Sequence, residues 1–102
     1  MTLEELEEII ASRAAADPSE SWTAKLLAKG PEKVAEKFGE EAIEAIIEAT
    51  KGNRENLTQE AADVLFHLLV MLRSQNVALS DVLEVLDARQ GQSGLQEKAS
   101  RT

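Results

Sequence analysis

The sequence predicts an all-α fold, a bundle of four to five helices, and three observations support this. Only two of the 102 residues are proline and five are glycine, and they fall where helices would end. Ala, Leu, Glu and Lys are abundant, and all four favour helices. Apolar residues recur at helical spacing, whereas the strict alternation typical of strands is hard to find. We expect residues 1–102 to form a single domain.

The composition excludes several classes of protein. There are 11 Lys and Arg residues against 19 Asp and Glu, a net charge of −8, and an acidic surface repels a nucleic-acid backbone. The absence of cysteine excludes disulfides, zinc–cysteine sites and thiol nucleophiles. The longest nearly apolar run, 64–72, is too short to span a membrane, and residues 1–8 lack the basic segment of a signal peptide. We therefore expect a cytoplasmic protein with no nucleic-acid or membrane partner.

The first helix is predicted over residues 3–16. Thr2 and Glu5 have the spacing of a capping box, in which each side chain bonds the backbone N–H of the other residue. Asp17-Pro18 ends the helix, because the residue before a proline disfavours the helical conformation.

A short helix over residues 22–28 and a long one over 31–50 are predicted next. Pro31 suits the first position of the long helix, where the missing N–H has no partner to lose. The apolar residues of this helix lie on two nearly opposite sides, one with Val34 and the other with Ile43. We expect the long helix to pack against two neighbours.

The fourth helix, predicted over residues 57–75, is apolar around nearly its whole circumference. Such a helix is normally buried, and a chain of this length has few elements with which to surround it. We therefore predict an obligate homodimer that completes the helical bundle. Ser80 is the predicted cap of a fifth helix over 81–89. Residues 95–101 are predicted to form a last helical turn, within a mobile tail over 89–101.

Two pairs of carboxylates are the candidate catalytic groups. Glu41 and Glu44 lie three residues apart on the long helix, and Glu60 and Asp63 lie three apart on the fourth, so each pair shares a face. An antiparallel hairpin of the two helices would place the pairs opposite one another. Asp63 is expected to be buried among apolar residues with no basic neighbour, which requires a compensating cation. Oxygen ligands alone select a hard ion, Mg²⁺ or Mn²⁺ as its substitute.

Simpler interpretations exist for these residues. Acidic pairs on helices are usually solvated, and this is the first interpretation of Glu41 and Glu44 taken alone. His67 is interpreted first as a core histidine bonded to a carboxylate, and alternatively as a residue that orients Asp63. Trp22 either stacks on a purine or anchors the short helix. Because Mg²⁺ held by carboxylates keeps positions open for substrate phosphates, the joint pattern indicates a reaction at phosphorus.

Residues 40–44, Glu-Glu-Ala-Ile-Glu, and after a 15-residue spacer residues 60–63, Glu-Ala-Ala-Asp, match an EExxE…ExxD pattern. The chain thereby resembles the all-α, MazG-like nucleoside triphosphate pyrophosphatases. Within them it is most similar to the phosphoribosyl-ATP pyrophosphatase family. The similarity extends over nearly the whole chain, through segments 21–30, 33–45, 61–70 and 89–101. Trp22 departs from the family pattern, where tyrosine is expected, but the metal pattern is intact.

The resemblance implies a homodimer that hydrolyses phosphoribosyl-ATP at the α–β phosphoanhydride, with Mg²⁺, to phosphoribosyl-AMP and pyrophosphate. This reaction is the second step of histidine biosynthesis. By position the metal ligands are Glu41, Glu44, Glu60 and Asp63, and Glu40 orients water or holds a second ion. The general base stays undecided.

Basic residues are expected to hold the phosphates that the metal leaves uncovered. The candidates are Lys25, Lys29, Lys37, Arg89, Lys98 and Arg101. Each of them taken alone is equally well interpreted as a solvated charge. Two alternative functions also stay open: a MazG-like enzyme that removes damaged nucleotides, and a helical dimerisation module without catalysis.

Overall fold

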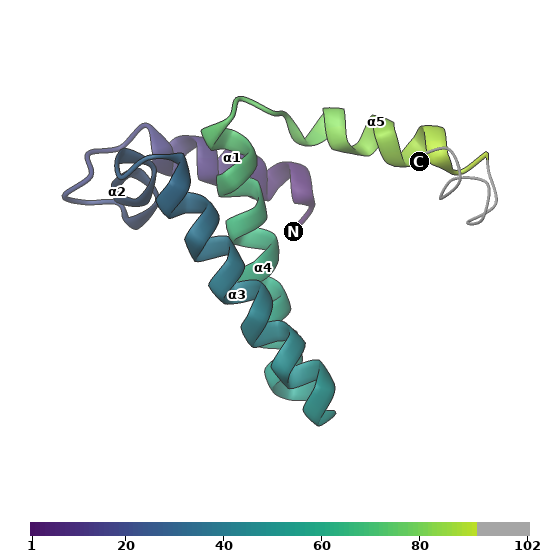
Figure 1. Cartoon of the computed structure of the whole chain (residues 1–102). Helices are drawn as coiled ribbons and strands as arrows, with labels where there is room; N and C mark the ends of the chain where they lie inside the picture. Colours follow the sequence, from purple (N-terminus) through teal and green to yellow (C-terminus); the bar gives the residue numbers. More distant parts are fainter. Residues whose placement is uncertain (92–102) are drawn as a thin grey trace.

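The computed structural model describes residues 1–91, which form five α-helices and no strand. The helices are α1 (Leu3–Ala14), α2 (Trp22–Ala28), α3 (Pro31–Lys51), α4 (Arg54–Ser74) and α5 (Leu79–Arg89). α3 and α4 form a long antiparallel hairpin, α1 and α2 pack at one end of it, and α5 projects away from that end (Figure 1). The all-α prediction is confirmed for this part of the chain. The predicted turn over 95–101 and most of the predicted tail lie outside the described residues.

Side chains before and after α1 define its ends. The Thr2 hydroxyl accepts a hydrogen bond from the Glu5 amide at 3.0 Å and donates one to the Glu5 carboxylate at 3.3 Å. The helix ends at Ala14, two residues earlier than predicted. Asp17 then accepts hydrogen bonds from the Ser19 amide at 2.8 Å and the Ser19 hydroxyl at 2.7 Å. These bonds hold the pKa of Asp17 below its ordinary value.

The turn between α3 and α4 is tighter than the sequence predicts. Gly52 caps α3 with a left-handed backbone, φ 73°, and its amide donates to the carbonyl of Ala49 at 3.2 Å. The Asn53 side chain accepts a hydrogen bond from the amide of Asn56 at 3.0 Å, so α4 begins at Arg54. The predicted start at residue 57 is wrong because Asn53 caps the following helix and does not merely close the preceding one.

Gly39, within α3, and Gly52, which caps it, are expected to respond oppositely to alanine. Gly52→Ala should lower the free energy of unfolding by about 1 kcal/mol, because a side chain strains the left-handed conformation. Gly39→Ala should raise it by about 0.5–1 kcal/mol, since Gly39 lies within the helix and an added Cβ meets no atom within 4 Å. Urea unfolding measures both. Equal shifts of the same sign would contradict the assigned conformations.

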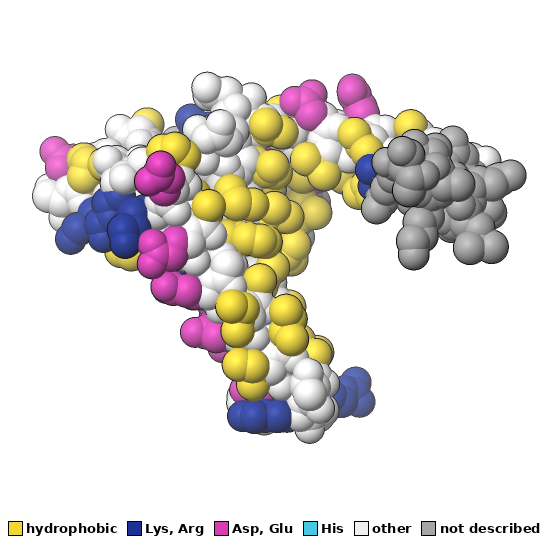
Figure 2. Space-filling model, viewed as in Figure 1, with side chains coloured by type: hydrophobic (Ala, Val, Ile, Leu, Met, Phe, Trp, Pro, Cys, Tyr) yellow, Lys and Arg dark blue, Asp and Glu magenta, His cyan; other side chains and the backbone are white. Residues whose placement is uncertain are grey.

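The hydrophobic core lies where α1, α2 and the start of α5 meet the hairpin. Its buried members are Ile10, Leu26, Val34, Leu69, Val70 and Leu79. Within one chain α4 is buried on part of its circumference only, and its buried residues, His67, Leu69 and Val70, all lie in its second half. The homodimer expected to cover the rest of α4 stays a prediction. Leu65 is 44% exposed, and Ile46 on α3 is 63% exposed. Hydrophobic side chains continue along the hairpin beyond the core (Figure 2).

α5 is attached to the rest of the fold at its first residue. The Leu79 amide donates a 2.7 Å hydrogen bond to the Glu7 carboxylate of α1, and the Leu79 side chain is buried. The cap is Ala78, whose own amide donates to Asp81 at 3.2 Å. The predicted cap, Ser80, lies inside the helix, because the long-range bond to Glu7 starts the helix earlier. Among residues 1–91, none of the helices combines the length and apolarity required to cross a membrane.

Candidate metal and phosphate site

The structure brings acidic side chains together across the α3–α4 hairpin. Glu41 of α3 and Glu60 and Asp63 of α4 each offer a carboxylate oxygen within 4.8 Å of the others. We call these three residues the acidic cluster. Glu44, one turn along α3, neighbours Glu60. The antiparallel hairpin therefore places the two predicted carboxylate pairs opposite each other.

Glu41 is the innermost carboxylate of the acidic cluster, only 7% exposed. The Lys37 ammonium lies 3.1 Å from its Oε1 and 3.9 Å from Oε2 of Glu40. The hydrogen bond to Glu41 raises the pKa of Lys37 above its ordinary value, and the charges of the surrounding carboxylates add to this effect. One positive charge thus balances part of the acidic cluster. Within residues 1–91, no lysine or arginine forms an ion pair with Glu44, Glu60 or Asp63.

Glu60 is in the least favourable electrostatic environment of the acidic cluster. Its Oε2 is buried and has no hydrogen-bond partner. Burial raises its pKa, and the neighbouring carboxyl of Glu44 raises it further through a hydrogen bond and through its charge. The charges of Asp63 and Glu41 act in the same direction. A buried carboxylate oxygen without a donor indicates a cation at this position.

Asp63 is exposed, so the expectation that it is buried among apolar residues is wrong within one chain. The first residues of α1 lie beside this part of α4 but leave Asp63 exposed. Beside it is a largely apolar pocket of about 460 Å³, lined by Leu3, Leu6 and Phe66 among others. Asp63 belongs to the acidic cluster because the hairpin places it near Glu41 and Glu60, and this does not require burial.

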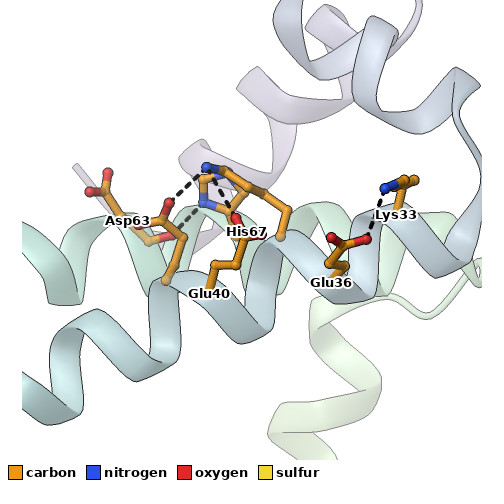
Figure 3. Close-up of polar contacts among 7 residues, drawn as sticks. Lys33, Glu36, Glu40, Asp63 and His67 are labelled. Atoms are coloured by element: carbon orange, nitrogen blue, oxygen red, sulfur yellow. Dashed lines mark hydrogen bonds and ion pairs between the residues drawn. The ribbon is translucent and has the colours of Figure 1, made fainter.

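His67 is buried, and its bonding differs from the expectation. Nδ1–H donates to the backbone carbonyl of Asp63 at 2.8 Å, while Nε2 is buried without a partner (Figure 3). The predicted bond to a carboxylate is therefore wrong. The ring lies edge-on to Phe66, with centroids 5.3 Å apart. His67 thus contacts the backbone that carries Asp63 and leaves the Asp63 carboxylate unengaged.

The residues present fit a hard divalent cation. Three carboxylates converge from two helices, a fourth lies beside them, and one buried oxygen has no donor. All of these ligand atoms are oxygen, which is the donor set that Mg²⁺ and Mn²⁺ share. Nitrogen and sulfur ligands are absent from this group of residues.

The raised pKa of Glu60 predicts how stability depends on pH in the metal-free protein. Folding favours the protonated carboxyl when its folded pKa exceeds the ordinary 4.5, so stability falls as pH rises through that folded pKa. Glu60→Gln should therefore raise the thermal unfolding midpoint at about pH 8 and leave it unchanged at about pH 4. Melting curves in EDTA measure this difference. A lower midpoint for the variant at the higher pH would contradict the assignment.

Only some of the predicted phosphate-binding residues lie near the acidic cluster. Lys29 and Lys37 line a pocket of about 120 Å³ between α2 and α3, next to the acidic cluster. Lys25 is exposed on α2 and does not line this pocket. Arg89 ends α5, which projects away from the hairpin (Figure 1). Lys98 and Arg101 lie outside the described residues.

Two further residues line the same pocket, Lys33 and Glu36, and neither was among the predicted site residues. They form an ion pair with each other, Nζ to Oε2 at 3.1 Å (Figure 3). The signal was present: Lys29, Lys33 and Lys37 recur at intervals of four. The interval was obscured because Lys29 precedes the break at Gly30 and the other two follow it.

Comparisons with known proteins identify the family of this chain. The family model described as phosphoribosyl-ATP pyrophosphohydrolase matches residues 3–90. A phosphoribosyl-ATP pyrophosphatase from Dinoroseobacter shibae is 69% identical over 99 residues, covering 97% of each chain. The proteins of the same name from Paracoccus denitrificans and Ruegeria pomeroyi are 68% and 67% identical over 97% of this chain, covering 92% and 94% of their own lengths.

A family-model match over most of the chain, together with this level of identity along nearly the full length of the relatives, establishes membership. The resemblance inferred from the acidic motifs is confirmed. The chain belongs to the phosphoribosyl-ATP pyrophosphohydrolase family, whose members are hydrolases acting on a phosphoanhydride bond.

Proposed function

We propose that this protein hydrolyses phosphoribosyl-ATP to phosphoribosyl-AMP and pyrophosphate, with Mg²⁺, as the second step of histidine biosynthesis. The single observation that carries the proposal is the acidic cluster with its unpartnered Glu60 oxygen, in a chain of this family. Without a cation the acidic cluster would repel a triphosphate. With a bound cation, the acidic cluster attracts the triphosphate.

The proposed metal ligands are Glu41, Glu44, Glu60 and Asp63. Bound Mg²⁺ supplies positive charge that offsets the phosphate oxygens and polarises the phosphoanhydride. Glu60 contributes the buried oxygen that lacks a donor, and exposed Asp63 lies on the side that substrate can reach. The proposed task of Glu40, which is exposed and one position before Glu41, is to orient water or hold a second ion.

Lys37 has a second proposed task beside the acidic cluster. In the structure it bonds Glu41 and lies near Glu40. Once a cation balances these carboxylates, the ammonium is released to hold a phosphate oxygen of the substrate. A lysine is protonated at neutral pH even without the contact that raises the pKa of Lys37, so its ammonium keeps the charge that such a role requires.

A pyrophosphate-release assay on phosphoribosyl-ATP, with Mg²⁺ and with EDTA, tests the proposal. We expect turnover that depends on Mg²⁺, is supported by Mn²⁺ and is absent in EDTA. A preference for ordinary or modified deoxynucleoside triphosphates over phosphoribosyl-ATP would overturn the substrate assignment. Turnover that persists in EDTA would overturn the metal assignment.

We also propose that the active protein is a cytoplasmic homodimer. The support is the large hydrophobic side chains left exposed on one chain, which include Ile43, Ile46, Ile47 and Leu65. They lie on the hairpin that carries the acidic cluster, so a second chain packed there adjoins the site. Contiguous exposed apolar surface of this kind marks an interaction site.

A further inference from the structure

The pocket between α2 and α3 has a wall composition that the hydrolysis of a phosphoanhydride does not explain. Trp22 and Leu26 form an apolar side, and three ammonium groups, those of Lys29, Lys33 and Lys37, surround it. We call it the Trp22 pocket. Figure 2 shows basic side chains gathered over this end of the molecule, although the chain as a whole carries −8.

Several charged groups of the Trp22 pocket contact other residues that line it. The Lys29 ammonium lies over the Trp22 ring, 5.7 Å from its centroid. Lys33 is paired with Glu36 at 3.1 Å, and a second carboxylate, Glu40, completes the lining beside Lys37. The pocket therefore combines an aromatic face, cations and carboxylates within about 120 Å³.

This combination matches a sugar phosphate better than a bare phosphate chain. Pyrophosphate presents only anionic oxygens, so an indole face offers it nothing and two carboxylates repel it. A ribose presents C–H groups that pack on an aromatic ring and hydroxyls that donate to carboxylates. Its phosphate is held by ammonium groups through charge-assisted hydrogen bonds. The indole ring, the carboxylates and the ammonium groups of the pocket then each contact a part of the sugar phosphate.

We propose that the Trp22 pocket binds the phosphoribosyl arm of the substrate, the group that distinguishes phosphoribosyl-ATP from ATP. This rests on the proposed function and assigns specificity to residues outside the acidic cluster. Lys29 and Lys33 hold the phosphate of the arm, Glu36 accepts from its hydroxyls, and Trp22 packs on the sugar. Since Glu40 adjoins Glu41, one substrate spans both sites.

Fluorescence titration in Mg²⁺-free buffer tests the pocket without catalysis, because Trp22 is the single tryptophan of the chain and there is no tyrosine. Ribose 5-phosphate should change the emission saturably, and pyrophosphate should not. The Lys29→Ala/Lys33→Ala double variant should lose the response, and Lys51→Ala, an exposed lysine at the far end of α3, should retain it. An equal response to pyrophosphate, or none to ribose 5-phosphate, would overturn the proposal.

Kinetics give a second, independent measurement. Lys33→Ala should raise KM for phosphoribosyl-ATP about tenfold, the effect of losing one charge-assisted hydrogen bond, with kcat within about twofold. The inhibition constant of ATP should not change, and Lys33→Arg should recover most of the loss. Equal weakening of ATP would instead place the triphosphate in this pocket and overturn the proposal.

The fluorescence titration and the pyrophosphate-release assay distinguish a wrong assignment of the Trp22 pocket from a wrong assignment of the reaction. A chain that releases pyrophosphate from phosphoribosyl-ATP but gives no fluorescence response to ribose 5-phosphate lacks the proposed arm site. A chain that binds ribose 5-phosphate but releases no pyrophosphate has the arm site and a different reaction.

Discussion

Glu41→Gln is expected to lower kcat/KM for phosphoribosyl-ATP by about 10³-fold and to weaken Mg²⁺ binding to a similar degree. The substitution keeps the shape of a 7% exposed side chain and removes its charge. A metal ion contributes several kcal/mol to stabilising charge at the reacting phosphate, and about 4 kcal/mol corresponds to a 10³-fold change in rate. Calorimetric titration with Mg²⁺ and the pyrophosphate-release assay measure the two effects.

The matched variants make this result specific to the acidic cluster. Asp63→Asn should reproduce the loss, although Asp63 is exposed, because both residues offer oxygens to one site. Glu55→Gln removes one carboxylate from the exposed first turn of α4 and should change neither measurement. Circular dichroism confirms that each variant is helical. Unchanged Mg²⁺ affinity in Glu41→Gln and Asp63→Asn would exclude the acidic cluster as the metal site.

The sequence predicts that the two carboxylate pairs face each other across the hairpin. It does not predict how exposed each carboxylate is to water. Spacing of three residues fixes a shared face, and the spacer before Glu60 allows only a short turn, so Glu41 and Glu60 had to meet. Whether water reaches Asp63 depends on which other helices cover α4. That is decided by packing between distant segments, and Asp63 proved exposed where burial was expected.

Most of the helix ends could be predicted from neighbouring residues, but the starts of α4 and α5 could not. Thr2, Pro31 and Gly52 mark ends that capping and backbone preferences predict. Asn53 suits both the close of one helix and the start of the next, and only the bond to the Asn56 amide decides between them. The start of α5 depends on Glu7, 72 residues away from Leu79, and periodicity carries no information about such a contact.

Ile46→Glu is expected to halve the mass of the protein in solution and to lower its stability and activity together. Ile46 is 63% exposed on one chain, where a surface substitution changes stability by no more than about 0.5 kcal/mol. In a dimer packed on the hairpin, the same glutamate is buried without a partner, at a cost of several kcal/mol. Light scattering should give about 22.2 kDa for the native protein, twice 11.1 kDa, and about 11.1 kDa for the variant.

Ser12→Glu, which adds the same charge to the exposed face of α1, is the control and should leave the dimer intact. Both variants add one carboxylate to an exposed helix face, but only Ile46→Glu places it on the hairpin. Were Ile46→Glu to remain as stable and as large as Ser12→Glu, the exposed isoleucines would face water in the native protein. If it instead dissociates and loses Mg²⁺-dependent turnover, the helices that carry the acidic cluster need a second chain to hold them in place, and the predicted obligate dimer follows from the same apolar residues that one chain leaves uncovered.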